Sequence, residues 1–285
     1  MATRMTSPLA GIRWLRDAIN LGARNPRTLV LAAALVLVCG IVPSLITTGL
    51  QFLFPNNQAM FVLAIGLSAL IGLALAPVFA GFLQVIHAIE TGQPTHARAI
   101  FAPYHTGVWK PVIGFSLLMW IVYAIAFALV VWAAGPEIRQ IYADLLAASA
   151  SGTEPMPMEP MPPGFMRAFA VGGVCGLLIG GIWTIGYGQI AIARRPVIAS
   201  LIDGIVGTLK NIPALIVLLL AAALLSIALV IVFVIIVTVL GLIAKFVGGW
   251  LAMVLLVPLY IALALGIYIV MFGLAYAMWR DICAR

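Results

Sequence analysis

The chain has 285 residues, of which 65% are hydrophobic and 8% are charged, and its mean hydropathy is +1.21. This composition excludes a water-soluble globular protein and predicts that lipid surrounds most of the chain. The formal net charge of +7 would also suit a nucleic-acid-binding protein, but the cations gather beside apolar segments, and no nucleic-acid partner is needed to explain them.

The first predicted element is an amphipathic helix over residues 9–24. Its apolar face holds Ile12, Leu15, Ala18, Ile19 and Gly22, and its polar face holds Arg13, Arg16, Asp17, Asn20 and Arg24. Such a pattern is typical of a helix that lies in the membrane interface. We expect Trp14 at the edge of the apolar face, with its indole N–H near water.

The polar sequence Arg24-Asn25-Pro26 follows and turns the chain into two apolar runs, 28–53 and 59–89. Each run exceeds the roughly 20 apolar residues that span a bilayer, and Pro43 and Pro77 are expected to kink them. Small residues recur every four positions in the second run, which predicts close helix packing inside one bundle, or alternatively a dimer seam. These packing residues are Ser68, Gly72 and Ala76.

The same arrangement recurs twice. A shorter interfacial segment, 95–111, ends at Lys110-Pro111 and precedes runs 111–134 and 166–193, where Gly172, Gly176 and Gly180 form a second packing stripe. A third amphipathic segment, 197–213, ends at Lys210-Asn211-Ile212-Pro213 and precedes runs 212–241 and 248–279, the last of which contains Pro258. Asp17 and Arg24-Asn25 match Asp203 and Lys210-Asn211 at the same offsets.

These repeats predict an all-α, polytopic membrane protein. It has six transmembrane helices in three hairpins, each hairpin preceded by a cytoplasmic amphipathic interfacial helix. The three units cover residues 9–89, 94–193 and 196–279 of a single integral membrane domain, 1–285.

The segment 136–164 is expected outside the membrane as a helix from Pro136 followed by a linker rich in proline and methionine. Met156, Met158 and Met161 are soft ligands that suit cuprous copper. The alternative is a linker with chance methionines and no metal.

The cations define an orientation. Twelve Lys and Arg residues fall on the side of the N-terminus and three on the other side, so the positive-inside rule places both termini in the cytoplasm. We expect eight of the twelve to contact the headgroups of anionic membrane lipids: Arg13, Arg16, Arg24, Arg98, Lys110, Arg194, Arg195 and Lys210.

No ionisable residue lies deep in a predicted span, and no motif for phosphate binding or hydrolysis is present. His87, Glu90 and His96 form the one cluster that resembles a metal or acid/base site. The alternative is that these side chains are solvated, and no cofactor is expected.

The stretch from Trp14-Leu15-Arg16 to Arg24-Asn25-Pro26, with Ala193-Arg194-Arg195-Pro196, resembles a broad group of bacterial inner-membrane proteins. The layout is similar to that of YciC-type proteins and of the membrane domain fused to some glycerophosphodiester phosphodiesterases. The catalytic domain of those phosphodiesterases has no counterpart in this chain. The resemblance implies a six-helix inner-membrane protein without established catalysis.

The leading hypothesis is therefore a non-enzymatic inner-membrane protein that handles lipids or other amphiphiles, or assists envelope assembly. The alternative is a facilitative transporter or channel for a neutral or hydrophobic solute, with Tyr187, Gln189, Gln84 or Ser68 lining its path. A third hypothesis, a membrane enzyme, requires His87, Glu90 and His96 to converge.

Overall fold

The structure is a computed structural model that describes residues 3–54, 57–151 and 164–284. Within these residues all regular elements are helical, and six helices are long and apolar enough to cross a membrane. They are α2 (Pro26–Leu53), α3 (Gln58–Glu90), α5 (Trp109–Ala134), α7 (Phe165–Ala191), α9 (Ile212–Val247) and α10 (Gly249–Cys283). The chain is thus a multi-pass membrane protein, as its composition predicts.

Five shorter helical segments accompany them: α1 (Ala10–Ile19), η1 (Ala97–Phe101), α4 (Ala102–His105), α6 (Pro136–Ser151) and α8 (Val197–Lys210). The bounds of the first four spans lie within about two residues of the predicted ones. Helix α9 continues past the predicted 241 because no breaker occurs before Gly248, whose φ is 119°. Met156, Met158 and Met161 lie outside the described residues.

Local capping explains where the first two spans begin. The side-chain oxygen of Asn25 accepts a hydrogen bond from the Thr28 amide at 3.2 Å, and Pro26 occupies the first turn of α2. Asn57 caps α3 in the same way, accepting from the Met60 amide at 3.1 Å. These side chains satisfy amides that have no partner inside the helix, so each span starts at a defined residue.

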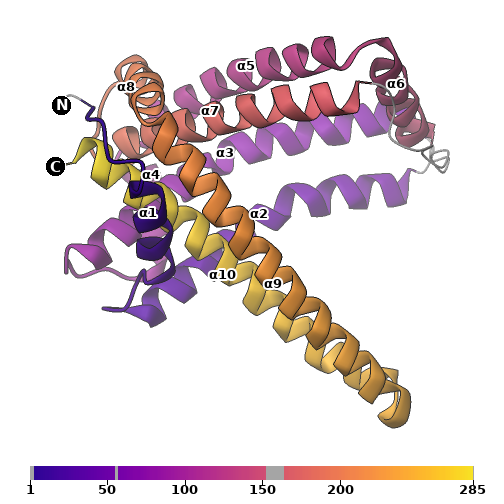
Figure 1. The fold of residues 1–285 in the computed structure, drawn as a ribbon. Coiled ribbons are helices and arrows are strands. Elements are labelled where there is room, and N and C mark those ends of the chain that lie inside the picture. The colour runs from indigo at the N-terminus through magenta and orange to yellow at the C-terminus, as the bar shows by residue number, and fades with distance from the viewer. Residues whose placement is uncertain (1–2, 55–56, 152–163, 285) are drawn as a thin grey trace.

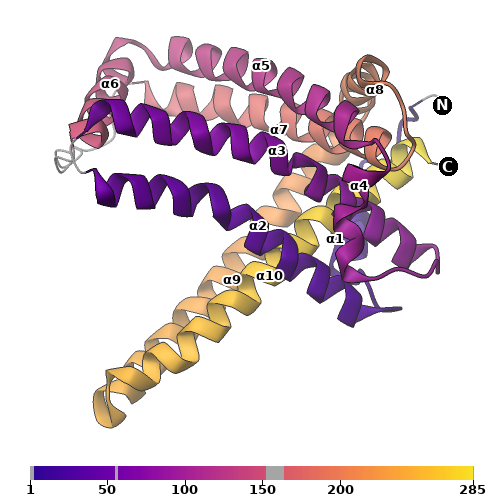
Figure 2. The same ribbon diagram turned by 180° about the vertical axis from the view of Figure 1, so that it is seen from behind.

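The helices are packed at one end and spread at the other (Figures 1 and 2). Helices α3, α5 and α7 run side by side, whereas α9 and α10 form an arm that inclines away from them. Both chain termini lie with α1, η1, α4 and α8 at one end, which we call the closed end. Helix α6 and the turn between α9 and α10 lie at what we call the open end.

Burial follows this division. The buried hydrophobic residues are concentrated in the first turns of α2, α5 and α9 and in the last turns of α3, α7 and α10, all at the closed end. None of the residues in the most apolar windows of α9 and α10 is buried. The core therefore occupies the closed end, and the arm is apolar on its outside.

Aromatic rings fill the centre of this core, where α3, α7 and α10 meet. The Phe272 ring lies 5.2 Å from Phe82, 5.8 Å from Phe79 and 6.3 Å from Trp183, measured between ring centroids. Trp183 stacks on Tyr187 at 4.8 Å. Rings at these separations pack as tightly as in a soluble core, so the closed end is filled.

Three short elements of the closed end, η1, α8 and α1, each approach a span at a glycine. A Cβ atom at Gly81 in α3 would overlap the carbonyl oxygen of Ile100 in η1, and one at Gly181 in α7 would lie 2.6 Å from the Thr208 hydroxyl in α8. A Cβ at Gly273 in α10 would lie 3.2 Å from the Ala18 backbone in α1. Only glycine allows these helices to approach so closely.

The predicted packing residues differ from one another in their surroundings. A Cβ at Gly72, Gly176 or Gly180 would meet no atom within 4 Å, and one at Gly172 would be 3.8 Å from Val130. The close approach in α7 lies one residue further on, and one residue rotates a side chain by about 100° around a helix. Of the other predicted packing residues, Ala76 is buried, and the Ser68 hydroxyl donates to the Pro43 carbonyl at 2.9 Å.

Candidate functional site at the closed end

A buried carboxylate attaches the N-terminal segment and α1 to α10. Asp281 accepts hydrogen bonds from Arg4 Nη2 at 2.6 Å and from the Trp14 indole at 3.0 Å, and Arg13 Nη2 lies 3.4 Å from it. Arg4 Nε also donates to the Asp281 carbonyl. A charge with low exposure needs such partners, so these contacts hold the two ends of the chain together.

Asn211 connects the same N-terminal segment to the junction between α8 and α9. Its side-chain oxygen accepts from the amide and the hydroxyl of Thr6, both at 2.8 Å. Its nitrogen donates to the carbonyls of Arg4 at 3.0 Å and Gly207 at 2.8 Å. These four hydrogen bonds use all the donors and acceptors of the Asn211 side-chain amide. Asn25, which occupies the matching position in the first repeat, caps α2 instead.

A second acidic residue of the repeat, Asp203, joins α8 to α7. Its Oδ2 accepts from Gln189 Nε2 at 2.7 Å and lies 3.2 Å from Arg195 Nε. The Trp279 indole of α10 donates to Gln189 Oε1 at 3.4 Å. Asp17, which matches Asp203 in the sequence repeat, pairs with Arg280 Nη2 of α10 at 2.8 Å. The matching offsets in the sequence single out these two aspartates but not their partners.

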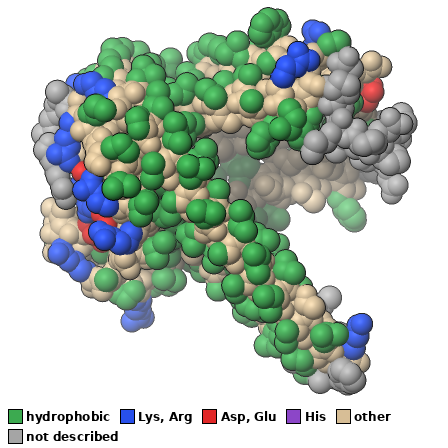
Figure 3. All heavy atoms as spheres, viewed as in Figure 1, with side chains coloured by type: hydrophobic (Ala, Val, Ile, Leu, Met, Phe, Trp, Pro, Cys, Tyr) green, Lys and Arg blue, Asp and Glu red, His purple; other side chains and the backbone are tan. Residues whose placement is uncertain are grey.

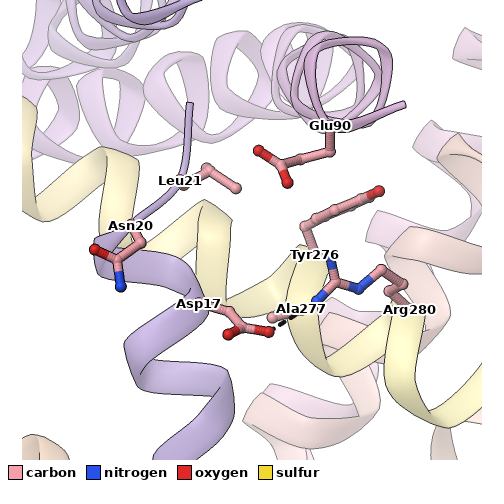
Figure 4. Close-up of a pocket in the computed structure, with 7 residues that line it drawn as sticks. All are labelled: Asp17, Asn20, Leu21, Glu90, Tyr276, Ala277 and Arg280. Atoms are coloured by element: carbon pink, nitrogen blue, oxygen red, sulfur yellow. Dashed lines mark hydrogen bonds and ion pairs between the residues drawn. The ribbon is translucent and has the colours of Figure 1, made fainter. Parts of the chain in front are cut away.

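A pocket of about 240 Å³ lies between α1, the end of α3 and the end of α10 (Figure 4). Its walls carry the Asp17–Arg280 ion pair and, opposite, the carboxylate of Glu90. Glu90 Oε1 accepts from the Gly22 amide at 3.3 Å, and Arg24 Nη1 donates to the Glu90 carbonyl at 2.6 Å. The lining residues are Asp17, Asn20, Leu21, Glu90, Tyr276, Ala277 and Arg280.

The basic side chains collect over α1, α8 and the chain termini, whereas few lie on the visible surface at the open end (Figure 3). Of the eight cations predicted to contact headgroups, Arg98, Lys110 and Arg194 are exposed, and Lys110 lies over the Trp109 ring. Arg16 is exposed beside Asp17 at 3.9 Å. Arg13 and Arg24 are exposed but also contact Asp281 and the Glu90 carbonyl.

Two of the eight are occupied by protein contacts. Arg195 is 30% exposed and pairs with Asp203, because the positive φ of Arg194 turns the chain back toward α7. Lys210 Nζ donates to the Thr3 carbonyl at 2.9 Å while its side chain stays at the surface. Arg195 thus has an ion-pair partner inside the protein, and its contact with headgroups stays a prediction.

Helix α8 turns its small residues toward the protein, and α1 does so with the exception of Trp14. In α8, Ser200, Gly204, Gly207 and Thr208 are buried, and Ile198, Ile202, Ile205 and Leu209 are exposed. In α1, Ile12 and Ile19 are exposed, whereas Trp14 is 2% exposed. The expected position of Trp14 near water is wrong, because Asp281 supplies its hydrogen-bond acceptor inside the protein.

The proposed metal cluster does not assemble. His87 Nδ1 lies 3.2 Å from the Tyr276 hydroxyl, Glu90 faces the pocket described above, and His96 is exposed before η1. Among the described residues, no group of three His, Cys, Asp or Glu side chains could hold a metal ion. The membrane-enzyme hypothesis required these three side chains to converge, and the structure does not gather them at one metal site.

The residues expected to line a transport path instead join helices. Tyr187 donates to the Ala76 carbonyl at 2.6 Å, and Gln84 Nε2 donates to the Ala191 carbonyl at 2.7 Å, so α3 and α7 are linked twice. Gln189 is 1% exposed and bonds Asp203. Buried polar groups need such partners. These three side chains therefore stabilise the closed end and do not face a pore.

Comparison with known proteins gives no relative: no family, no curated protein and no solved structure matches the chain. The resemblance to YciC-type proteins stays a prediction from the sequence.

Proposed function

We propose that this protein resides in the bacterial inner membrane with both termini in the cytoplasm, and that it holds lipids or other amphiphiles without catalysing a reaction on them. In this proposal the spans form three hairpins, and α1, the η1–α4 segment and α8 lie in the cytoplasmic interface. The observation that carries it is the one-sided burial: the buried hydrophobic residues are concentrated at the closed end, and the arm of α9 and α10 is apolar and exposed.

The length of the arm supports a membrane setting. Helix α9 has 36 residues and is thus roughly 54 Å long at 1.5 Å per residue, well beyond the roughly 30 Å of a hydrocarbon core. A long apolar helix fits a bilayer by tilting. The arm inclines away from α5 and α7 (Figure 1), which suits a bilayer in which α5 and α7 stand more upright.

The space between the arm and the other spans is the place we assign to acyl chains. The surface is hollowed between the arm and the layer of α3, α5 and α7 (Figure 3). Val38 and Leu45 of α2 and Ile261 and Ile267 of α10 are aliphatic and exposed. In water such a surface would be costly, whereas lipid tails cover it without cost.

The exposed cations give the first test. Reversing the charge of Arg98, Lys110 and Arg194 together should weaken the retention of anionic phospholipid at least tenfold, because each cation near an anionic surface contributes about 1 kcal/mol. Native mass spectrometry of the purified protein with phosphatidylglycerol measures it. Lys245→Glu, which changes an exposed cation near the tip of the arm, is the matched control and should leave retention unchanged. If the wild type retains no lipid, the proposed function is wrong.

The alternative function, a facilitative transporter, requires the closed end to open, and the aromatic cluster around Phe272 would have to separate. Nitroxide spin labels at Leu45 in α2 and Ile261 in α10 distinguish the two functions, because double electron–electron resonance measures the distance between the labels. We expect one long distance in lipid, from a permanently spread open end. A second, short-distance population that responds to added solute would favour the transporter.

A further inference from the structure

The pocket between α1, α3 and α10 differs in charge from its neighbours. Two other hollows of about 280 and 210 Å³ adjoin it along α1, and arginines outnumber carboxylates in both. The pocket in Figure 4 has two carboxylates, Asp17 and Glu90, and one guanidinium, Arg280. Asp17 pairs with Arg280 at 2.8 Å, whereas the Glu90 carboxylate has no ion-pair partner among the described residues.

The acceptors of the pocket suit a primary ammonium group. Among the described residues, Glu90 Oε1 receives one hydrogen bond, from the neutral Gly22 amide at 3.3 Å. Asn20, at the end of α1, also lines the pocket (Figure 4). A primary ammonium donates three charge-assisted hydrogen bonds to such oxygens. A quaternary ammonium has no N–H and cannot donate any.

Donors for an anion lie beside these acceptors. Arg24 is exposed and donates to the carbonyl of Glu90, one of the residues that line the pocket. The Nε–H of Arg280 is buried and has no hydrogen-bond partner in the part of the chain that the structure describes. Guanidinium groups such as these suit a phosphate. Charges of both signs on one small pocket indicate a zwitterionic ligand.

We propose that this pocket binds a primary ammonium group next to a phosphate, as in an ethanolamine phospholipid headgroup or the free glycerophosphoethanolamine. The inference rests on the proposed function, since it names the headgroup that the lipid-holding protein selects. Leu21 and the end of α3 place the pocket where the apolar spans end, at the depth of headgroups in that proposal.

Native mass spectrometry with equal amounts of phosphatidylethanolamine and phosphatidylcholine of identical acyl chains tests this selection. We expect about tenfold more bound phosphatidylethanolamine than phosphatidylcholine, because one charge-assisted hydrogen bond changes the affinity by about that factor. Glu90→Gln should reduce the preference to less than twofold. The glutamine amide oxygen still accepts from the Gly22 amide, so the fold is retained. Asp144→Asn, which removes an exposed carboxylate on α6 at the open end, should leave the preference intact.

Free glycerophosphoethanolamine separates the two sources of the ligand. If it displaces the bound ethanolamine lipid, the pocket takes the soluble zwitterion; if it does not, the ligand is the lipid, and either result supports the assignment. Equal binding of the two lipids, or a preference that survives Glu90→Gln, overturns the assignment while leaving the proposed function standing. Absence of any retained lipid counts against the proposed function instead, and the free zwitterion then tests the pocket by itself.

Discussion

Replacing Gly81 by leucine is expected to prevent the chain from reaching its folded state. A Cβ atom at this position would overlap the Ile100 carbonyl oxygen and lie 2.7 Å from the Ile100 Cα. Both are backbone atoms, so no side-chain rotation relieves the clash. Inserting atoms into a packed core typically costs about 1–3 kcal/mol, and here η1 must move off α3, which puts the loss at the upper end or beyond. Thermal unfolding followed by size-exclusion chromatography measures it.

The matched control lies in the same helix. A Cβ at Gly72 would meet no atom within 4 Å, so Gly72→Leu should keep the melting temperature or raise it slightly through the better helix propensity of leucine. If Gly81→Leu yields no protein, Gly81→Ala and Gly72→Ala give a milder comparison with the same expected order. Equal melting temperatures in that pair would contradict the close approach of η1 to α3.

The second large effect is expected from Asp281→Ala, which should lower the free energy of unfolding by about 2–3 kcal/mol. The change leaves the guanidinium of Arg4, that of Arg13 and the Trp14 indole without their shared acceptor. Loss of one partner of a buried pair costs up to about 5 kcal/mol. Arg4 and Arg13 are about half exposed, and water therefore replaces part of the lost interaction. Denaturation in a detergent titration, followed by tryptophan fluorescence, gives the difference.

The same variant should release the N-terminal segment, since the Asp281 carboxylate is one of its anchors. Trypsin is then expected to cleave after Arg4 or Arg13 faster than in the wild type, while α5 and α7 remain protected. Asp281→Asn keeps an acceptor for the Trp14 indole, so its cleavage rate should lie between those of the wild type and Asp281→Ala. Asp144→Ala, at an exposed position of α6, serves as the control, and an equal loss of stability there would show that the Asp281 contacts contribute nothing specific.

Features that depend on local sequence were predictable. The six spans follow from uninterrupted apolar length, and Asn25-Pro26 marks the start of α2 because its capping chemistry is local. The matching Asp17 and Asp203 also pointed to equivalent roles, since each joins a short helix to a neighbouring span. Their partners, Arg280 and Gln189, lie in other parts of the chain, and no spacing rule connects them.

The packing faces were not predictable, and the reason lies in the solvent. In water an apolar stripe identifies the face that meets the protein, but lipid tails are as apolar as a protein core, so the same stripe also fits a face that meets lipid. The glycines of α7 illustrate this ambiguity: Gly176 and Gly180 face open space, and Gly181 meets Thr208. Trp14 shows the same limit for a polar side-chain group: its indole N–H can be buried because Asp281, 267 positions along the chain, accepts its hydrogen bond.

The sequence by itself determined that this is a six-span membrane protein whose cations collect at one end, because apolar length and charge are properties of the chain. Only the tertiary structure decided that the packed core lies at that end alone, that the arm of α9 and α10 stands apart, and that Asp17, Glu90 and Arg280 share one pocket. These features depend on contacts between residues remote in sequence, where a glycine or a paired charge, rather than hydrophobicity, selects which surfaces meet.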